Sequence, residues 1–250
     1  MTKMDLTRKE LFHRDGFLIL PGFMTSEEMH RIESDVVRFI RETVPVMSRA
    51  DAMFEDYGDA GTLKQINGME RDRALASLFE LPKIEALVEE LLGPVIPKGI
   101  EMFNKPPRIG KGTPPHQDGF YFCLTPCEAL TVWIAIDDAD AENGAVSYVR
   151  GSHHLGVVPH GATHVLGFSQ GLEGGEAQKF GEPALCVVRR GDCLVHHCRT
   201  IHFAGPNRTD RSRRALGLVY YSATARLDEA AQERYRESLR KQREAAGITS

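Results

Sequence analysis

The second half of the chain is built from short apolar segments that follow one another without helical segments between them. These segments cover residues 128–137, 144–151, 183–190, 192–198 and 214–222. Turn-forming residues separate them, as at 142–144 and 190–192. Because parallel strands need long crossover connections, closely spaced strands indicate an antiparallel sandwich or jelly roll. We therefore expect a jelly-roll core over residues 95–225, interrupted by a lid-like insert over 152–182.

The preceding residues, 1–94, show a mostly helical pattern after a short apolar strand. Thr25 and Glu28 have the spacing of a capping box, and apolar residues then recur at helical spacing. Predicted helices cover 26–42, 70–80 and 82–92, with a charged C-terminal helix within 226–250. The segment 43–68 shows no period and is expected to form a long loop, a type of segment often involved in function. The pattern predicts one α+β, mainly β domain over 1–250, with helices packed outside the jelly roll.

Composition and charge exclude several classes of function. The net charge of −4 over 250 residues gives no electrostatic footprint for DNA or RNA. No apolar run approaches the roughly 18 residues that a transmembrane helix needs, so we expect no membrane partner. Five cysteines without a zinc-type spacing indicate free thiols and a cytoplasmic location. The sequence carries no signal for an oligomeric state.

One motif in the core points to metal chemistry, since residues 114–120 read PPHQDGF. On extended backbone His116 and Asp118 point to the same side, so an imidazole and a carboxylate face one point in space. The pair alone occurs often by chance, and a metal site needs a further ligand from elsewhere in the chain. The downstream candidates are His196, His197 and His202. Two imidazoles and one carboxylate suit non-haem iron(II) and leave coordination positions open for O2 and a chelating cosubstrate.

Three sequence blocks resemble the phytanoyl-CoA dioxygenase family of Fe(II)/2-oxoglutarate oxygenases. The blocks are FNKPPRIGKGTPPHQDGFYF (103–122), VWIAIDDADAENGAVSYVRGSHHLG (132–156) and GDCLVHHCRTIHFAGPNRTDRSRR (191–214). The resemblance implies a double-stranded β-helix, which is a cupin-like jelly-roll barrel with helices packed outside. It also implies Fe(II), the cosubstrate 2-oxoglutarate and O2 as reactants.

The resemblance selects the site residues among the candidates. It implies that His116, Asp118 and His202 are the iron ligands and the catalytic centre. His197 then remains a neighbour inside the fold. Arg213, which opens an apolar strand, corresponds to the arginine that binds the distal carboxylate of 2-oxoglutarate with its planar fork.

Further cosubstrate contacts are implied at Gln117, Trp133 and Lys64. Two positions depart from the family pattern. Ala204 stands where the family often has a serine that contacts the cosubstrate, and we expect Thr131 to supply that hydrogen bond. Glu101 stands where a family member has an apolar residue, and we expect it to pair with a cationic substrate group if it faces the pocket.

The substrate mouth is expected to be lined by Tyr121, Phe122 and His160. The resemblance implies a dioxygenase that hydroxylates its substrate and releases succinate and CO2. The chain has no basic patch of the size that CoA needs, which favours a small polar metabolite. Two alternatives stay open: a cupin-like hydrolase or isomerase that holds another metal with an activated water, and a non-enzymatic protein that binds iron and 2-oxoglutarate.

Overall fold

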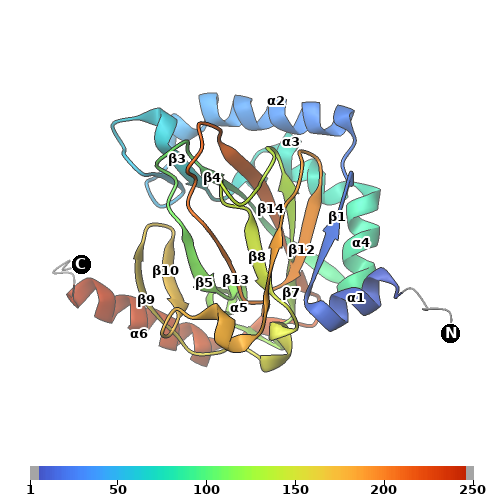
Figure 1. Ribbon diagram of the computed structural model, residues 1–250, viewed down its shortest axis with the longest axis vertical. Coiled ribbons are helices and arrows are strands. Elements are labelled where there is room, and N and C mark those ends of the chain that lie inside the picture. The colour runs from blue at the N-terminus through green and yellow to red at the C-terminus, as the bar shows by residue number, and fades with distance from the viewer. Residues whose placement is uncertain (1–5, 246–250) are drawn as a thin grey trace.

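The fold consists of two facing antiparallel sheets, as the computed structural model of residues 6–245 shows (Figure 1). The helices of the first hundred residues pack against one sheet, and the C-terminal helix lies apart from them. The major sheet contains, in spatial order, β1 (Phe17–Leu20), β12 (Cys193–His197), β7 (Ala129–Ala135), β14 (Arg213–Ser222), β4 (Val95–Lys105), β3 (Leu63–Ile66) and β2 (Ala52–Phe54). The minor sheet contains β11 (Pro183–Cys186), β8 (Val146–Val149), β13 (His202–Ala204) and β5 (Thr113–His116). Two smaller pairs are β9 (His160–Val165) with β10 (Phe168–Leu172), and β6 (Leu124–Thr125) with β15 (Arg226–Leu227). The ends of the predicted ranges, residues 1–5 and 246–250, lie outside the described residues.

The helices lie mostly in the first hundred residues, as the sequence predicts. They are α1 (Arg8–Asp15), α2 (Ser26–Glu42), α3 (Arg73–Ala76), α4 (Pro82–Leu92), α5 (Asp118–Phe122) and α6 (Glu229–Ala245). Short 3-10 helices occur at Val44–Val46, Ala60–Thr62, Met69–Arg71, Ser77–Glu80, Ser152–Leu155 and Ala177–Phe180. The capping box predicted at Thr25 and Glu28 is present and starts α2. Within residues 6–245, each helix is either too short or too polar to cross a bilayer.

The two faces of the major sheet have different roles. On β14, Leu216, Leu218 and Tyr220 belong to the apolar core shared with α2 and α4. The alternate residues Arg213 and Ala215 face the minor sheet. Because side chains alternate along a strand, the same sheet closes a helical core on one side and lines a cavity on the other.

Three expectations need correction. The segment 43–68 is not a plain loop, because β2 and β3 extend the major sheet past β4. The insert 152–182 contains the β9–β10 hairpin, which packs beside β5. The predicted jelly-roll arrangement of antiparallel sheets is confirmed, but the sheets formed by residues 6–245 do not join into a closed barrel.

Candidate functional site

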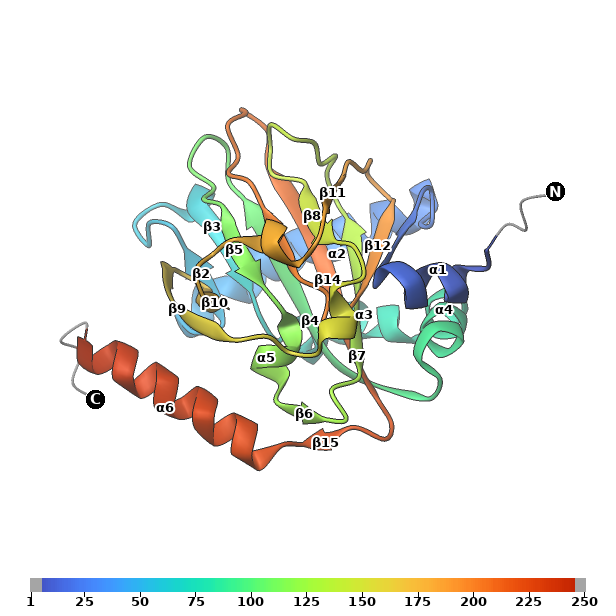
Figure 2. The ribbon, with the colours of Figure 1, turned by 60° about the horizontal axis from the view of Figure 1, so that its bottom comes forward.

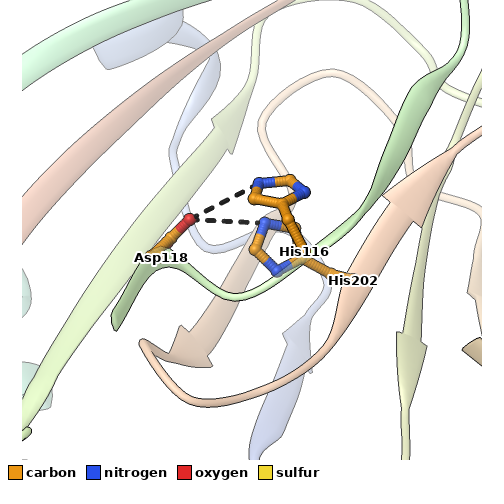
Figure 3. A group of neighbouring side chains, drawn as sticks. All are labelled: His116, Asp118 and His202. Atoms are coloured by element: carbon orange, nitrogen blue, oxygen red, sulfur yellow. Dashed lines mark ion pairs between the residues drawn. The ribbon is translucent and has the colours of Figure 1, made fainter. Parts of the chain in front are cut away.

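Three polar side chains converge at the end of the minor sheet where β5 ends and β13 begins (Figure 3). His116 ends β5 and His202 begins β13, and the two residues lie directly opposite each other in the antiparallel register. Asp118 follows two residues after His116, at the start of α5. Its Oδ1 lies 3.6 Å from Nε2 of His116 and 3.6 Å from Nε2 of His202. Two ligands at about 2.1 Å from one ion lie at most about 4.2 Å apart, so one divalent ion fits between these atoms.

Both imidazoles are held with Nε2 toward the aspartate. The Nδ1 atom of His116 bonds to the Pro114 carbonyl at 2.8 Å, and that of His202 bonds to the Thr200 carbonyl at 3.0 Å. A carbonyl only accepts, so each Nδ1 carries the proton and each Nε2 keeps a free lone pair. Burial lowers the pKa of both histidines, more strongly for His202, where His116 adds to the effect. The rings are therefore neutral, which is the form that binds metals.

The second oxygen of Asp118 is held from the major sheet. His196 on β12 contacts Oδ2 through Nε2 at 3.0 Å, and the Thr131 hydroxyl on β7 donates to the same oxygen at 3.3 Å. The Tyr148 hydroxyl lies 2.9 Å from Nδ1 of His196. Burial alone would raise the pKa of Asp118, but His202, His196 and His116 together hold that pKa well below its usual range. The carboxylate is thus ionised and fixed, with Oδ1 directed to the two histidines.

Arg213 begins β14 and is buried beside the same cavity. Its guanidinium carbon lies 5.5 Å from the centre of the Trp133 ring, and Nε and Nη1 have no hydrogen-bond partner in residues 6–245. Burial lowers its pKa to about 10. Lys105, its register partner on β4, donates to the Lys111 carbonyl at 2.6 Å and to the Thr113 hydroxyl at 3.2 Å. One end of the cavity therefore carries two adjacent buried basic groups, of which Arg213 is the cation.

Other predicted cosubstrate residues have different surroundings. Lys64 reaches the cavity, but its Nζ forms an ion pair with Glu55 at 3.2 Å. Gln117 does not reach it: its amide nitrogen donates to the Gly156 and Arg199 carbonyls, and its amide oxygen accepts from the Val158 amide. Thr131 lines the cavity, but its hydroxyl is directed at Asp118 rather than at the position of Ala204. Trp133 lies in the cavity wall beneath Arg213.

The predicted substrate residues also divide into two groups. Tyr121, Phe122 and Glu101 line the cavity. The Tyr121 hydroxyl donates a hydrogen bond to the Gln170 carbonyl and accepts one from the Gln170 amide. These bonds tie Tyr121 to the β9–β10 hairpin. His160 does not line the cavity. Its Nε2 accepts a hydrogen bond from the backbone amide of Gln117, and its ring stacks on that of Phe120 with a centroid distance of 4.4 Å.

The His–Asp–His cluster and Arg213 line the same cavity, which has a volume of about 1160 Å³ and lies between the two sheets. The β9–β10 hairpin and α6 form its outer wall, with Tyr235 and Leu239 contributed by α6. Figure 2 shows α6 passing the hairpin and α5. The volume exceeds the range of about 300–1,000 Å³ that is common for single-ligand pockets, so it has room for two small molecules.

A sequence profile described as Phytanoyl-CoA dioxygenase (PhyH) matches residues 12–215. The chain belongs to this family. The match covers both sheets except residues 216–222 of β14 and includes the whole His–Asp–His cluster. The family membership that the three sequence blocks indicate is confirmed.

Several curated and solved relatives are similar to this PhyH protein. Mouse peroxisomal phytanoyl-CoA dioxygenase is 26% identical over 233 residues, which is 88% of this chain and 69% of that protein. The probable alpha-ketoglutarate-dependent hypophosphite dioxygenase of Stutzerimonas stutzeri is 28% identical over 217 residues, 84% of this chain and 76% of that protein. The structure of the epimerase SnoN in complex with Fe3+, alpha ketoglutarate and nogalamycin RO matches with a TM-score of 0.69 and 28% identity. That match covers 86% of this chain and 82% of SnoN.

Sequence reasoning missed the residues that support the cluster in this PhyH protein. His196 was a ligand candidate, but in the structure it holds Asp118 from the opposite sheet. Tyr148 and Lys105 carried no signal, because an isolated Tyr or Lys in a strand pattern is more often an ordinary packing or surface residue. Only the register of facing strands brings them to the site.

Proposed function

We propose that the chain is a non-haem iron(II) oxygenase that uses 2-oxoglutarate and O2 to hydroxylate a small polar metabolite. The observation that carries this proposal is the buried Arg213, whose Nε and Nη1 lack a partner in residues 6–245 and which lines the cavity of the His–Asp–His cluster. A buried cation without an anion is strongly unfavourable, so the site favours a ligand with a carboxylate. When bound, iron(II) and 2-oxoglutarate supply the chemistry: O2 is consumed, succinate and CO2 are released, and a substrate C–H becomes C–OH.

In this proposal His116, Asp118 and His202 hold the iron. The donor set of two imidazoles and one carboxylate is the one that non-haem iron(II) oxygenases use. Because Oδ2 of Asp118 is engaged by His196, only Oδ1 is free to bind the metal, and the remaining coordination positions stay available. The chain itself fixes the tautomers of both histidines through backbone carbonyls, so the ligands are positioned before the metal arrives.

Arg213 and Lys105 hold the distal carboxylate of the cosubstrate in this proposal. Lys105 is 4% exposed, and burial followed by repulsion from Arg213 lowers its pKa to about 6. An anion between the two groups relieves this repulsion. Thr113 lies opposite Ala204 in the β5–β13 register and is hydrogen-bonded to Lys105, so it supplies a hydroxyl near the position where the family often has serine.

The substrate would occupy the outer part of the cavity, between the metal ligands and the wall formed by the hairpin and α6. Tyr121 and Phe122 line this part from α5. We also propose that the insert 152–182 sets specificity, since its hairpin residues Ala162 and Phe168 line the cavity. The curated relatives differ widely in the substrates that their names give, so the fold alone does not select one.

An anaerobic titration of metal-free protein with Fe(II) and then 2-oxoglutarate, followed by visible absorption, tests the proposal. We expect a weak charge-transfer band in the wild type. Arg213→Gln should need roughly 10- to 100-fold more 2-oxoglutarate, since charged hydrogen bonds contribute about 1.5–3 kcal/mol. Arg211→Gln is the matched control, because Arg211 is exposed and paired with Asp140. Bound iron without a band would refute the proposal and favour the hydrolase or isomerase alternative.

We further propose a single oxygenase domain over 1–250 that acts in the cytoplasm without a nucleic-acid partner. Five free cysteines support a reducing compartment, and the net charge of −4 argues against a polyanionic partner. Both sheets line one cavity, which supports one functional unit.

A further inference from the structure

Glu101 lies on β4, and its carboxylate lines the cavity. It forms neither a hydrogen bond nor an ion pair with any residue in 6–245. The other cavity carboxylates are engaged, Glu55 with Lys64 and Asp118 with His196. An unpaired carboxylate in a partly desolvated cavity is unfavourable, and such groups occur preferentially at functional sites.

The position of Glu101 separates it from the cationic end of the cavity. Glu101 and Lys105 are four residues apart on β4, which places their backbones about 13 Å apart along the strand. The charges that raise the pKa of Glu101 are those of Asp118 and Glu70, and neither Arg213 nor Lys105 contributes. The cavity is therefore polarised, with the Arg213 cation at one end and the Glu101 and Asp118 carboxylates toward the other.

The surroundings of Glu101 are aromatic. Its register partner on β14 is Gly217, where a Cβ would approach the Phe103 ring to 3.0 Å and the Thr131 methyl group to 3.4 Å. The glycine thus allows the Phe103 ring to pack closely over β14 next to Glu101. Phe103 and Phe122 both line the cavity on this side, and aromatic faces attract cations.

Burial, and then the negative charges of Asp118 and Glu70, raise the pKa of Glu101 to about 7. An anionic substrate would add to this repulsion, whereas a cation would remove it. A carboxylate combined with aromatic walls is the chemistry that recognises ammonium groups.

We propose that the substrate carries a cationic nitrogen, as an amine or ammonium group, that pairs with the Glu101 carboxylate. The proposal rests on the proposed function only in taking this cavity as the substrate site. The cosubstrate dianion then occupies the Arg213 end, and the substrate ammonium occupies the Glu101 end, so the two ligands are sorted by charge. Metal ligation by Asp118 leaves Glu101 as the carboxylate available to the substrate.

Calorimetric titration of the full-length, metal-free protein at pH 8 with hexylamine, 1-hexanol and hexanoate tests the proposal. The three probes share a chain length and differ in charge. We expect hexylamine to bind at least tenfold more tightly than 1-hexanol, while hexanoate reports separately on the Arg213 end. Glu101→Gln should reduce the amine preference to below twofold. Glu55→Gln, which removes a paired cavity carboxylate, should leave that preference unchanged.

Two outcomes would overturn the proposal. One is the absence of an amine preference in the wild-type protein. The other is a preference that survives Glu101→Gln and disappears in Asp118→Asn, because the aspartate would then be the attracting group. A thermal melt of each variant excludes misfolding as the cause. Since this experiment uses no iron, its result is independent of the charge-transfer test of the oxygenase activity.

Discussion

Replacing Glu101 by glutamine is expected to stabilise the metal-free protein at pH 8. The substitution keeps the shape of the side chain and removes its ability to ionise. Burial, Asp118 and Glu70 raise the pKa of Glu101 from its ordinary value of 4.5 to about 7 in the folded chain. In the unfolded chain the carboxyl ionises near the ordinary value, so ionisation favours the unfolded state as the pH rises between the two values.

The size of the effect follows from the two pKa values. Each pKa unit corresponds to about 1.36 kcal/mol, so the full difference sets an upper limit of about 3 kcal/mol at pH 8. At pH 5 most of the folded carboxyl is protonated and the cost falls to about 1 kcal/mol or less. Part of the Glu101 side chain faces the cavity and its water, so we expect a gain of about 1–3 kcal/mol at pH 8. For a chain of this size, each kcal/mol corresponds to roughly 2–4 °C in melting temperature.

Thermal unfolding of both proteins, measured by circular dichroism at pH 5 and pH 8, checks this expectation. Glu55→Gln is the control, because removing its carboxylate breaks the ion pair with Lys64 and should not stabilise the fold. A Glu101→Gln protein that melts no higher than the wild type at pH 8 would refute the reasoning. An equal gain at both pH values would also refute it, since ionisation would then not be the cause.

Two further expectations concern the groups that surround the metal and cosubstrate sites. His196→Ala should weaken metal binding by roughly 10- to 100-fold in a metal titration, because the buried Oδ2 of Asp118 loses a partner. His197→Ala, which removes a partner of Glu128 instead, should leave the metal affinity unchanged, and equal losses would contradict the assignment. Binding of 2-oxoglutarate to the iron-loaded protein at pH 7.5 should take up a proton, because an anion raises the Lys105 pKa from about 6. Calorimetry in two buffers of different ionisation enthalpy measures this uptake, and Lys105→Met should abolish it; uptake that persists in the variant would contradict the role of Lys105.

Local signals in the sequence were sufficient for the elements that depend on local interactions. The capping residues Thr25 and Glu28, followed by helical periodicity, predicted α2 with its observed bounds. The short strands β2 and β3 escaped prediction. The sequence of β3, LKQI, shows no alternation of apolar and polar side chains, although all four residues are buried in the structure. Their pairing with each other and with β4 is a non-local interaction that spacing does not reveal.

The residues of the site also divide into those that local sequence patterns predict and those whose role depends on tertiary contacts. The convergence of His116, Asp118 and His202 agrees with the side-chain alternation of a strand and with the resemblance to the family. The same alternation accounts for Gln117, which lies between two cavity residues and is therefore directed away from the cavity. His160 lies in the predicted insert, but its ring is used to anchor the Gln117 backbone. Such hydrogen bonds depend on tertiary contacts and cannot be derived from residue type alone.

The C-terminal helix α6 lies beyond the segment that the family profile matches, which ends at residue 215. It nevertheless supplies Tyr235 and Leu239 to the cavity wall, and Tyr235 packs against Phe120 and Tyr121. Mutations in this appended helix can therefore reshape the cavity while leaving the strands that carry the metal ligands intact. The arrangement gives evolution, and protein engineers, a peripheral element in which substrate preference can diverge separately from the chemistry of the core.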